Sequence, residues 1–261
     1  MEFVTLNPYM KKDVMNLYVG TSAYSIKEWK GSFYPKDISA KDMLKFYSSK
    51  FNSVEINNTF YRLPAESVVR SWGEQVPDGF SFSIKASQKI THFKRLKDVG
   101  DETEYLVRAA RTLGEKLGVL LFQLPPNMKK DLPRLQTCLA LLSGDIRIAF
   151  EFRHASWFDE EVFELLRQNN CSLCIADTDD EFEVPFVRTA DWGYLRLRRE
   201  GYSPAALKKW IKRIEDQDWK TAFVFFKHED EGTGPKLAMQ FMKLREAPVK
   251  ASSRKTKSKS A

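Results

Sequence analysis

The chain has 261 residues, of which 43% are hydrophobic and 30% are charged, and its formal net charge is +7. This size suits one large globular domain or two small ones. Every apolar run is shorter than the roughly 20 residues that span a bilayer, and the N-terminus lacks the pattern of a secretory signal. We therefore expect a cytoplasmic protein with no membrane partner.

The three cysteines, Cys138, Cys171 and Cys174, are too few for a disulfide framework. Cys171 and Cys174 form a C-x-x-C pair, but they lie in CSLCIAD, which has the composition of a buried strand. Residues three apart on a strand face opposite ways, and no second pair of ligands completes a zinc site. We interpret all three as core residues.

The positive charge is concentrated at the C-terminus. From Val249 onward the chain contains five basic residues and no acidic one, which accounts for most of the net charge. We expect an N-terminal extension over residues 1–16, one folded domain over 17–247 and a disordered basic tail over 248–261. The basic residues from Lys250 to Lys259 could contact nucleic acid without sequence specificity.

Eight short β-rich runs follow one another between Leu17 and Glu246. Seven of the eight are followed by a stretch whose apolar residues are three and four apart, the period of an amphipathic helix. The runs are LYVGTS (17–22), SVEINNTF (53–60), GFSFSIKA (79–86), VLLFQLP (119–125), RIAFEFR (147–153), SLCIAD (172–177), YLRLR (194–198) and TAFVFFKH (221–228).

The connections in the first half of the chain predict four helices. Ser39 and Asp42 resemble a capping box ahead of the first, and residues 65–75 predict the second. The third ends at Gly118, where a C-terminal glycine cap belongs. The apolar stripes are Met43, Tyr47 and Phe51 in the first helix, Leu106, Ala109, Leu113 and Leu117 in the third, and Leu132, Leu135, Leu139 and Leu142 in the fourth.

The connections in the second half are less uniform. A helical run begins near Trp157. The sixth connection, TDDEFEVPFVRTADWG, predicts no helix and at most a short strand at 183–189. Ser203 and Pro204 have the residue types of an N-cap and a first helical position, ahead of Leu207, Trp210, Ile211 and Ile214.

Eight strands with helical crossovers in this length predict a TIM-type (β/α)8 barrel, a single domain with an irregular sixth crossover. A doubly wound open sheet is the alternative. It normally has a glycine-rich first turn for a nucleotide, whereas VGTSAYS carries one glycine. The barrel is favoured.

Ionisable and amide side chains appear where these strands end. In a barrel, alternate strand residues point inward, and the C-terminal ends of the strands build the active site. We therefore expect these side chains to converge at one mouth. They are Glu55, Asn57, Lys85, Gln123, Glu151, Arg153, Asp177, Arg196 and Arg198, and all three histidines, His92, His154 and His228, follow strand ends. The alternative is that the inward ion pairs are structural only.

At these same motifs the chain resembles the YecE-like family, also called domain of unknown function 72. The matching stretches are VGTS with WKGSFYP, FNSVEINNTFYRLP, FSIKASQKITH, LGVLLFQLPP, AFEFRHASW, the strand-end Asp177 and YLRLR. The resemblance implies a single TIM-barrel domain and leaves function open. It also implies site roles for Glu55, Asn57, Tyr61, Lys85, His92, Gln123, Glu151, Arg153, His154 and Asp177. The chain departs from the family pattern at Ala23-Tyr24, at RREGY and at FKHED.

The first functional hypothesis is an enzyme acting on an anionic, phosphorylated substrate. Arg153 and Lys85 would hold the anion, with Arg196, Arg198, Asn57, Gln123 and Tyr61 also contacting the substrate. Glu151 or Asp177 would be the general base, His154 or His92 would shuttle the proton, and Glu55 completes the catalytic set. Phosphoester or phosphodiester hydrolysis is one version. Phosphodiester hydrolysis of this kind would need a metal cluster, and three histidines and three carboxylates are few ligands for several ions. The cofactor is therefore unknown, and a divalent metal ion is one possibility.

The second hypothesis is a binding protein whose barrel mouth and basic tail hold nucleic acid without turnover. Aromatic residues near the first two loops would stack bases, although such residues also commonly pack loops against the barrel rim. They are Tyr24, Trp29, Phe33, Tyr34, Phe60 and Tyr61. A third hypothesis is an interaction scaffold with a degenerate site and no tight pocket.

Overall fold

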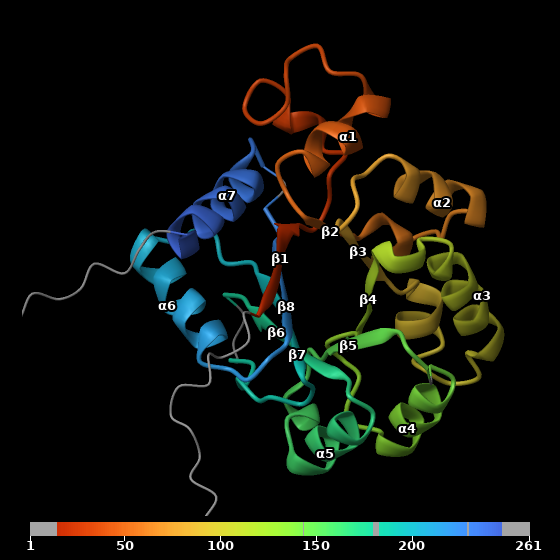
Figure 1. Ribbon diagram of the computed structural model, residues 1–261. Helices are drawn as coiled ribbons and strands as arrows, with labels where there is room; N and C mark the ends of the chain where they lie inside the picture. The colour runs from red at the N-terminus through yellow and green to blue at the C-terminus, as the bar shows by residue number, and fades with distance from the viewer. Residues whose placement is uncertain (1–14, 143, 180–182, 229, 247–261) are drawn as a thin grey trace, which may run out of the picture.

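The computed structural model of the protein describes residues 15–142, 144–179, 183–228 and 230–246. Eight parallel strands form one sheet in the order β1-β8-β7-β6-β5-β4-β3-β2, which closes nearly into a barrel (Figure 1). All eight coincide with predicted runs, so the TIM-type barrel is confirmed. The strands are β1 (Asn16–Thr21), β2 (Ser53–Ile56), β3 (Ser81–Lys85), β4 (Leu117–Gln123), β5 (Arg147–Glu151), β6 (Ser172–Asp177), β7 (Trp192–Leu197) and β8 (Thr221–Phe226).

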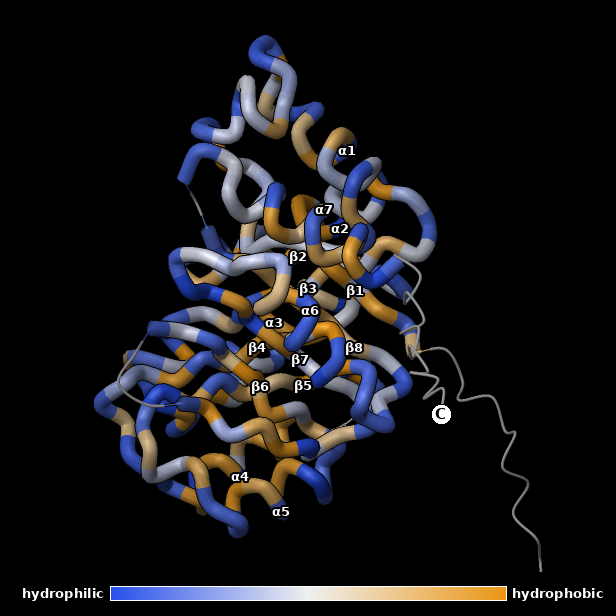
Figure 2. The backbone as a smooth tube through the Cα atoms, turned by 90° about the vertical axis from the view of Figure 1, so that its left-hand side faces the viewer, coloured by the Kyte–Doolittle hydropathy of each residue, from blue (hydrophilic) through white to orange (hydrophobic). Residues whose placement is uncertain are grey.

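Helices surround the ring of strands (Figure 1). They are α1 (Met43–Ser48), α2 (Glu66–Glu74), α3 (Gly100–Arg111), α4 (Leu132–Ala140), α5 (Glu160–Gln168), α6 (Pro204–Glu215) and α7 (Thr233–Glu246). The N-cap predicted for α6 is confirmed, because the Ser203 side chain accepts a hydrogen bond from the Ala206 N–H. Apolar positions concentrate in the central strands and on the inner sides of the helices (Figure 2).

Two predicted helix caps are wrong. Ser39 donates to the Asp42 carboxylate at 2.5 Å, and neither side chain caps a backbone N–H. Gly118 is not a cap but lies inside β4, where a Cβ would come within 2.2 Å of the Ser81 hydroxyl. The turn after α3 uses Gly114 instead, whose φ of 57° favours glycine.

The irregular sixth crossover is confirmed for the described residues between β6 and β7, which contain no helix. The strand predicted at 183–189 is wrong. This segment forms no backbone hydrogen-bond ladder with a neighbouring strand, and it bonds to β6 and the residue before it through the side chain of Thr189. The Thr189 hydroxyl accepts from the Leu173 N–H at 2.7 Å and donates to the Cys171 carbonyl at 2.8 Å.

Side chains connect β1 to β2, the two ends of the sheet. The Asn52 amide donates to the Leu17 carbonyl and accepts from the Val19 N–H, both at 2.8 Å. The buried Tyr47 hydroxyl accepts from the Thr21 N–H at 2.8 Å. These bonds satisfy backbone groups that a closed ladder would otherwise pair.

The barrel interior is apolar toward the N-terminal ends of the strands. Its members include Val119, Leu121, Ala149, Cys174, Trp192, Tyr194, Phe223 and Phe225. Cys174 faces this interior, while Cys171 packs in the core outside it, and all three cysteines are buried. The prediction of core cysteines is therefore confirmed.

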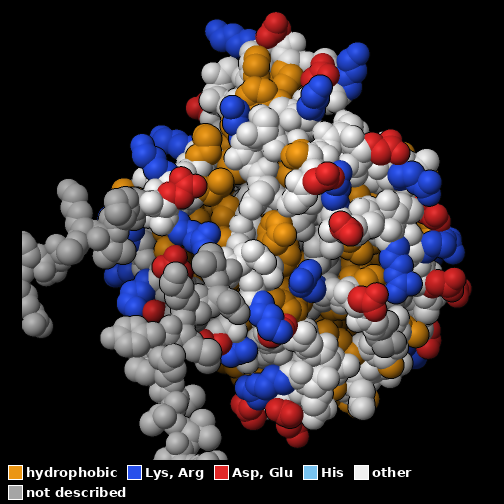
Figure 3. All heavy atoms as spheres, in the orientation of Figure 1, with side chains coloured by type: hydrophobic (Ala, Val, Ile, Leu, Met, Phe, Trp, Pro, Cys, Tyr) orange, Lys and Arg blue, Asp and Glu red, His pale blue; other side chains and the backbone are white. Residues whose placement is uncertain are grey.

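The outer surface mixes charges of both signs with apolar side chains on the face seen in Figure 3. Among the described residues, no helix is both long enough and apolar enough to cross a membrane. The whole of the expected basic tail, residues 248–261, and residues 1–14 of the expected N-terminal extension lie outside the described residues.

Candidate functional site at the barrel mouth

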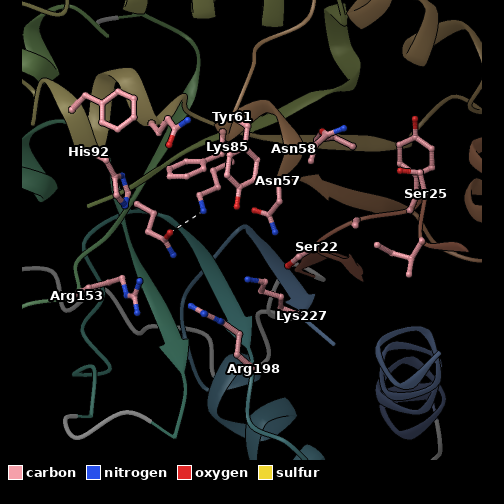
Figure 4. A pocket seen from close by; sticks show the side chains of 18 residues that line it. Ser22, Ser25, Asn57, Asn58, Tyr61, Lys85, His92, Arg153, Arg198 and Lys227 are labelled. Carbon is pink, nitrogen blue, oxygen red and sulfur yellow. Dashed lines mark hydrogen bonds between the residues drawn. The ribbon is translucent and has the colours of Figure 1, made fainter. Parts of the chain in front are cut away.

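A pocket of about 540 Å³ opens at the C-terminal ends of the strands. The end of every strand except β6, or the residues directly after it, contributes to the lining. Four cationic side chains face the pocket: Lys85, Arg153, Arg198 and Lys227 (Figure 4). Among the described residues, no Asp or Glu lines it. The pocket is therefore strongly electropositive and suits an anion.

The carboxylates lie beneath the pocket floor in a buried network. Arg196 is fully buried, and its guanidinium donates to Glu55 Oε1 at 2.9 Å and also pairs with Glu151 Oε2. The Tyr194 hydroxyl donates to the second oxygen of Glu55 at 2.6 Å. Both carboxylates are thus satisfied by buried donors, the condition that makes a buried charge tolerable.

Gln123 connects this network to the pocket. Its amide oxygen accepts from Lys85 Nζ at 2.8 Å, and its amide nitrogen donates to Glu151 Oε1 at 2.7 Å. Burial alone would raise the pKa of Glu151, but Arg196 and Arg198 outweigh it and hold that pKa at about 2. A carboxylate this acidic and this fully bonded is a poor proton acceptor.

Lys85 is the ionisable group best placed to change its charge near neutral pH. Burial, helped by the Arg196 guanidinium, lowers the pKa of Lys85 to about 8. Its ammonium lies 4.2 Å from the centroid of the Phe60 ring. A lysine with a pKa close to the working pH can both bind an anion and exchange a proton.

His92 lines the pocket but stays neutral. Burial, together with the positive charges of Lys85 and Arg153, lowers the pKa of His92 to about 4. Its Nδ1 lies 2.9 Å from the Thr91 hydroxyl. The imidazole can therefore act as a neutral hydrogen-bonding group at pH 7, but the pKa near neutrality expected for a proton shuttle is absent.

Two buried polar atoms at the pocket have no partner among the described residues. They are the Ser22 hydroxyl and the Asn57 amide nitrogen. Both side chains line the pocket, as Lys227 does (Figure 4). Since buried polar groups are almost always hydrogen-bonded, these two atoms can each bond a water or a polar ligand group in the pocket.

The chain matches the model of the family described as "Protein of unknown function DUF72" over residues 18–260. The protein belongs to the DUF72 family. The resemblance to the YecE-like family is thereby confirmed, since the two names describe one family.

Two kinds of relative support this membership. UPF0759 protein YunF of Bacillus subtilis is 26% identical over 269 residues, covering 87% of this chain and 94% of YunF. The crystal structure of a DUF72 family protein from Thermotoga maritima has a TM-score of 0.76 and 27% identity, covering 89% of this chain and 100% of that one. A DUF72 family structure from Enterococcus faecalis has a TM-score of 0.74 at 19% identity, covering 89% and 96%, and supports the fold.

The predicted site residues of this DUF72 protein divide into three groups. The pocket lining includes Asn57, Tyr61, Lys85, His92, Gln123, Arg153 and Arg198. Glu55, Glu151 and Arg196 lie together beneath the floor. Asp177 and His154 lie apart from the pocket lining.

Asp177 is not brought to the mouth, which corrects the prediction of a base there. It lies three residues from the inward-facing Cys174 and so faces the outside of the barrel. Its carboxylate accepts from Arg199 at 2.7 Å, from the Tyr202 hydroxyl at 2.8 Å and from the Trp210 indole at 3.1 Å. This carboxylate fastens α6 to the end of β6.

His154 also has a local role. Its Nδ1 accepts from the Ser156 N–H at 3.1 Å, which caps the short helical turn after β5. The third histidine, His228, contacts the carbonyl of Arg199. Neither ring is part of the pocket lining, so proton transfer by His154 does not fit this geometry.

Most of the first-loop aromatic residues pack against the barrel rim. Trp29 and Tyr34 are buried, and Phe33 makes ring contacts with both. Tyr24 is half-buried, whereas Tyr61 is exposed; these two and Phe60 line the pocket.

Several lining residues were not predicted from the sequence, among them Ser22, Phe93 and Lys227. Lys227 could have been found, because it continues the inward alternation of Phe223 and Phe225 in β8. Ser22 directly follows β1, and Phe93 ends the helical turn Lys89–Phe93 after β3. Both side chains are uncharged, so the prediction from ionisable residues at strand ends did not include them. Among the described residues, no three His, Cys, Asp or Glu side chains converge on a point that could hold a metal ion.

Proposed function

We propose that this protein is an enzyme that binds a small phosphorylated substrate in the barrel mouth and exchanges a proton with it through Lys85. The observation that carries the proposal is the pocket lining, which contains four cations and, within the described chain, no carboxylate. Arginine and lysine in this arrangement suit phosphate, with Arg153 the most available because it makes no ion pair to another described residue.

The network beneath the floor supports the same proposal. Arg196 pairs with both Glu55 and Glu151, and of the four described pocket cations only Arg198 forms an ion pair with either of these carboxylates, at 3.2 Å from Glu151. Gln123 holds Lys85 at the floor through a neutral amide, and the ammonium makes no direct ion pair with a carboxylate of the described residues. An anion entering the pocket would meet this charge in a partly desolvated site, where electrostatic attraction is strong.

Proton transfer at a carbon of the substrate fits these residues better than phosphoester hydrolysis. Lys85, with its pKa of about 8, can accept or return a proton near neutral pH. Hydrolysis would use a carboxylate base or a metal-bound water. In the described part of the chain the inward carboxylates lie below the floor, and no metal-ligating cluster is formed.

The pH dependence of anion binding tests this proposal. Ribose 5-phosphate is a dianion above about pH 7, since the second pKa of a phosphate ester is about 6. Lys85 is charged below its pKa of about 8 and loses that charge above it. We expect the affinity, measured by isothermal titration calorimetry, to fall by about tenfold between pH 7.5 and pH 9.5.

A Lys85→Met variant should bind more weakly at pH 7.5 and show no such fall. Lys208→Met is the control, because this lysine is exposed on α6 away from the pocket, and it should behave as the wild type does. Absence of binding at millimolar ribose 5-phosphate would contradict the proposal. Equal pH dependence in the Lys85→Met variant would contradict the role of Lys85.

Nucleic-acid binding by the mouth and the basic tail stays a prediction. The basic residues from Lys250 to Lys259 lie outside the described residues. The pocket itself is enclosed by loops from many strands, a shape that suits a small molecule more than a continuous strand. A steep fall of affinity with salt, dependent on the tail, would distinguish nucleic-acid binding.

A further inference from the structure

Two aromatic side chains are unusually exposed at the rim of the pocket. Tyr61 is 74% exposed and Phe93 is 71% exposed, the highest values among the large hydrophobic residues described. Both line the same pocket as the four cations. Rings of this size are normally buried by folding, so their exposure beside a binding pocket indicates contact with a ligand.

Packing within the protein does not account for these two rings. Trp29, Phe33 and Tyr34 fill the space between the first loop and α1, and two of them are almost fully buried. Tyr61 has one aromatic neighbour, Phe60, at 5.2 Å between centroids. Phe93 makes no ring contact with another described residue.

Phe60 connects one of the exposed rings, Tyr61, to Lys85 at the pocket floor. Its ring meets Tyr61 edge to face at 84°, meets His92 at 83° with 4.8 Å between centroids, and lies 4.2 Å from Lys85 Nζ. Figure 4 shows Tyr61 and Lys85 on the same side of the pocket. The Phe60 ring therefore contacts both the exposed Tyr61 ring and the Lys85 ammonium.

We propose that the ligand is a phosphate ester that carries a planar aromatic ring, as a nucleoside monophosphate does. The phosphate contacts Lys85 and Arg153, and the ring stacks on Tyr61, on Phe93 or between them. Stacking suits any ring with a π-face, and it adds to the charge contacts without using a charged side chain. The cavity of about 540 Å³ lies within the usual range for a small organic ligand.

This inference rests on the proposed function, because the phosphate must first bind at the cations. The two are separated by comparing AMP with ribose 5-phosphate, which keeps the phosphate and lacks the ring. Isothermal titration calorimetry at pH 7.5 should show that AMP binds more tightly by roughly 5- to 100-fold, the range that stacking of one base supplies.

Tyr61→Ala and Phe93→Ala test the two rings. At least one variant should lower the affinity for AMP toward that of ribose 5-phosphate and leave the affinity for ribose 5-phosphate unchanged. Leu141→Ala is the control, because Leu141 is also exposed but lies outside the pocket lining. All three side chains are exposed, so circular dichroism should show folded proteins.

Equal affinity of the wild type for AMP and ribose 5-phosphate would overturn the ring inference and leave the proposed function standing. Failure of both ligands to bind would overturn both. Equal loss for both ligands in the ring variants would mean that the rings support the pocket and do not stack. Tighter binding of a single-stranded oligonucleotide than of AMP would overturn the inference and indicate that the pocket binds nucleic acid.

Discussion

Replacing Arg196 by methionine is expected to lower the free energy of unfolding by about 3–5 kcal/mol. Arg196 is fully buried and is shared by Glu55 and Glu151, which are buried as well. Without the guanidinium, two carboxylates stay in the barrel interior with too little compensating charge. Equilibrium unfolding in urea measures the change, with the midpoint and slope fitted together.

The pH dependence of stability should change sign in this variant. In the wild type, the pKa of Glu151 is held at about 2, below its ordinary value, so this carboxylate stabilises the fold above about pH 4.5 and loses that effect as the pH falls toward 2. In Arg196→Met, the burial of Glu151 is no longer offset by this guanidinium, so we expect the pKa of this carboxyl to rise above its ordinary value. The variant should therefore gain stability as the pH falls from 7 toward 5.

Two further variants separate lost charge compensation from lost packing. Arg198→Met removes a partly exposed guanidinium that contacts Glu151 at 3.2 Å, and we expect a loss of about 1 kcal/mol or less. Adding Glu55→Gln to Arg196→Met removes one unpaired charge and should restore part of the stability. An Arg196→Met protein within 1 kcal/mol of the wild type would show that the network is not required for folding.

Lys85→Met and Lys85→Arg should separate binding from proton transfer. Lys85→Met is expected to weaken ribose 5-phosphate binding by roughly 10- to 100-fold, the range for losing a hydrogen bond to a charged group. Lys85→Arg keeps the positive charge, so most of the affinity should remain. An arginine does not deprotonate in a protein, so this variant should lose proton transfer by at least about 100-fold.

Proton transfer can be measured without knowing the product. Carbonyl-containing sugar phosphates are incubated with the enzyme in D₂O, and exchange of carbon-bound protons is followed by NMR. The wild type should promote exchange with the sugar phosphate that it binds, and Lys208→Met should match it. Undiminished exchange in Lys85→Arg would assign the proton transfer to another group, while no exchange by the wild type would leave a binding site without the proposed chemistry.

The alternation of residues along each strand predicted well which side chains point into the barrel, because successive side chains of a strand face opposite sides. Glu55, Lys85, Glu151 and Arg196 all point into the barrel as expected, and each is buried. Alternation does not predict height along the barrel axis. Glu151 therefore lies under the floor, whereas Arg153, two residues later on the same side, lines the pocket.

The wrong placements come from treating nearness to a strand end as nearness to the mouth. Asp177 ends β6 but faces the outside of the barrel, since it lies three residues from Cys174, which the structure shows facing inward. His154 follows β5, yet its ring turns back to cap Ser156. Loop side chains of this kind depend on local hydrogen bonds, which periodicity does not report.

The pKa values could not be predicted from residue types. His92 was attractive because an unperturbed imidazole titrates near neutrality, but burial and neighbouring cations lower its pKa to about 4. Lys85 was expected only to bind, and burial lowers its pKa into the range useful for proton exchange. Both shifts arise from residues distant in sequence that the barrel brings together.

A crystal structure grown with selenate would test the central claim most directly, since this tetrahedral anion is located by its anomalous scattering. The proposal predicts a peak in the pocket, within hydrogen-bonding distance of Lys85 Nζ and of the Arg153 or Arg198 guanidinium. Peaks only on the outer surface, such as in the hollow beside Arg199, Tyr202 and Trp210, with none at the mouth, would contradict an anion site at the mouth.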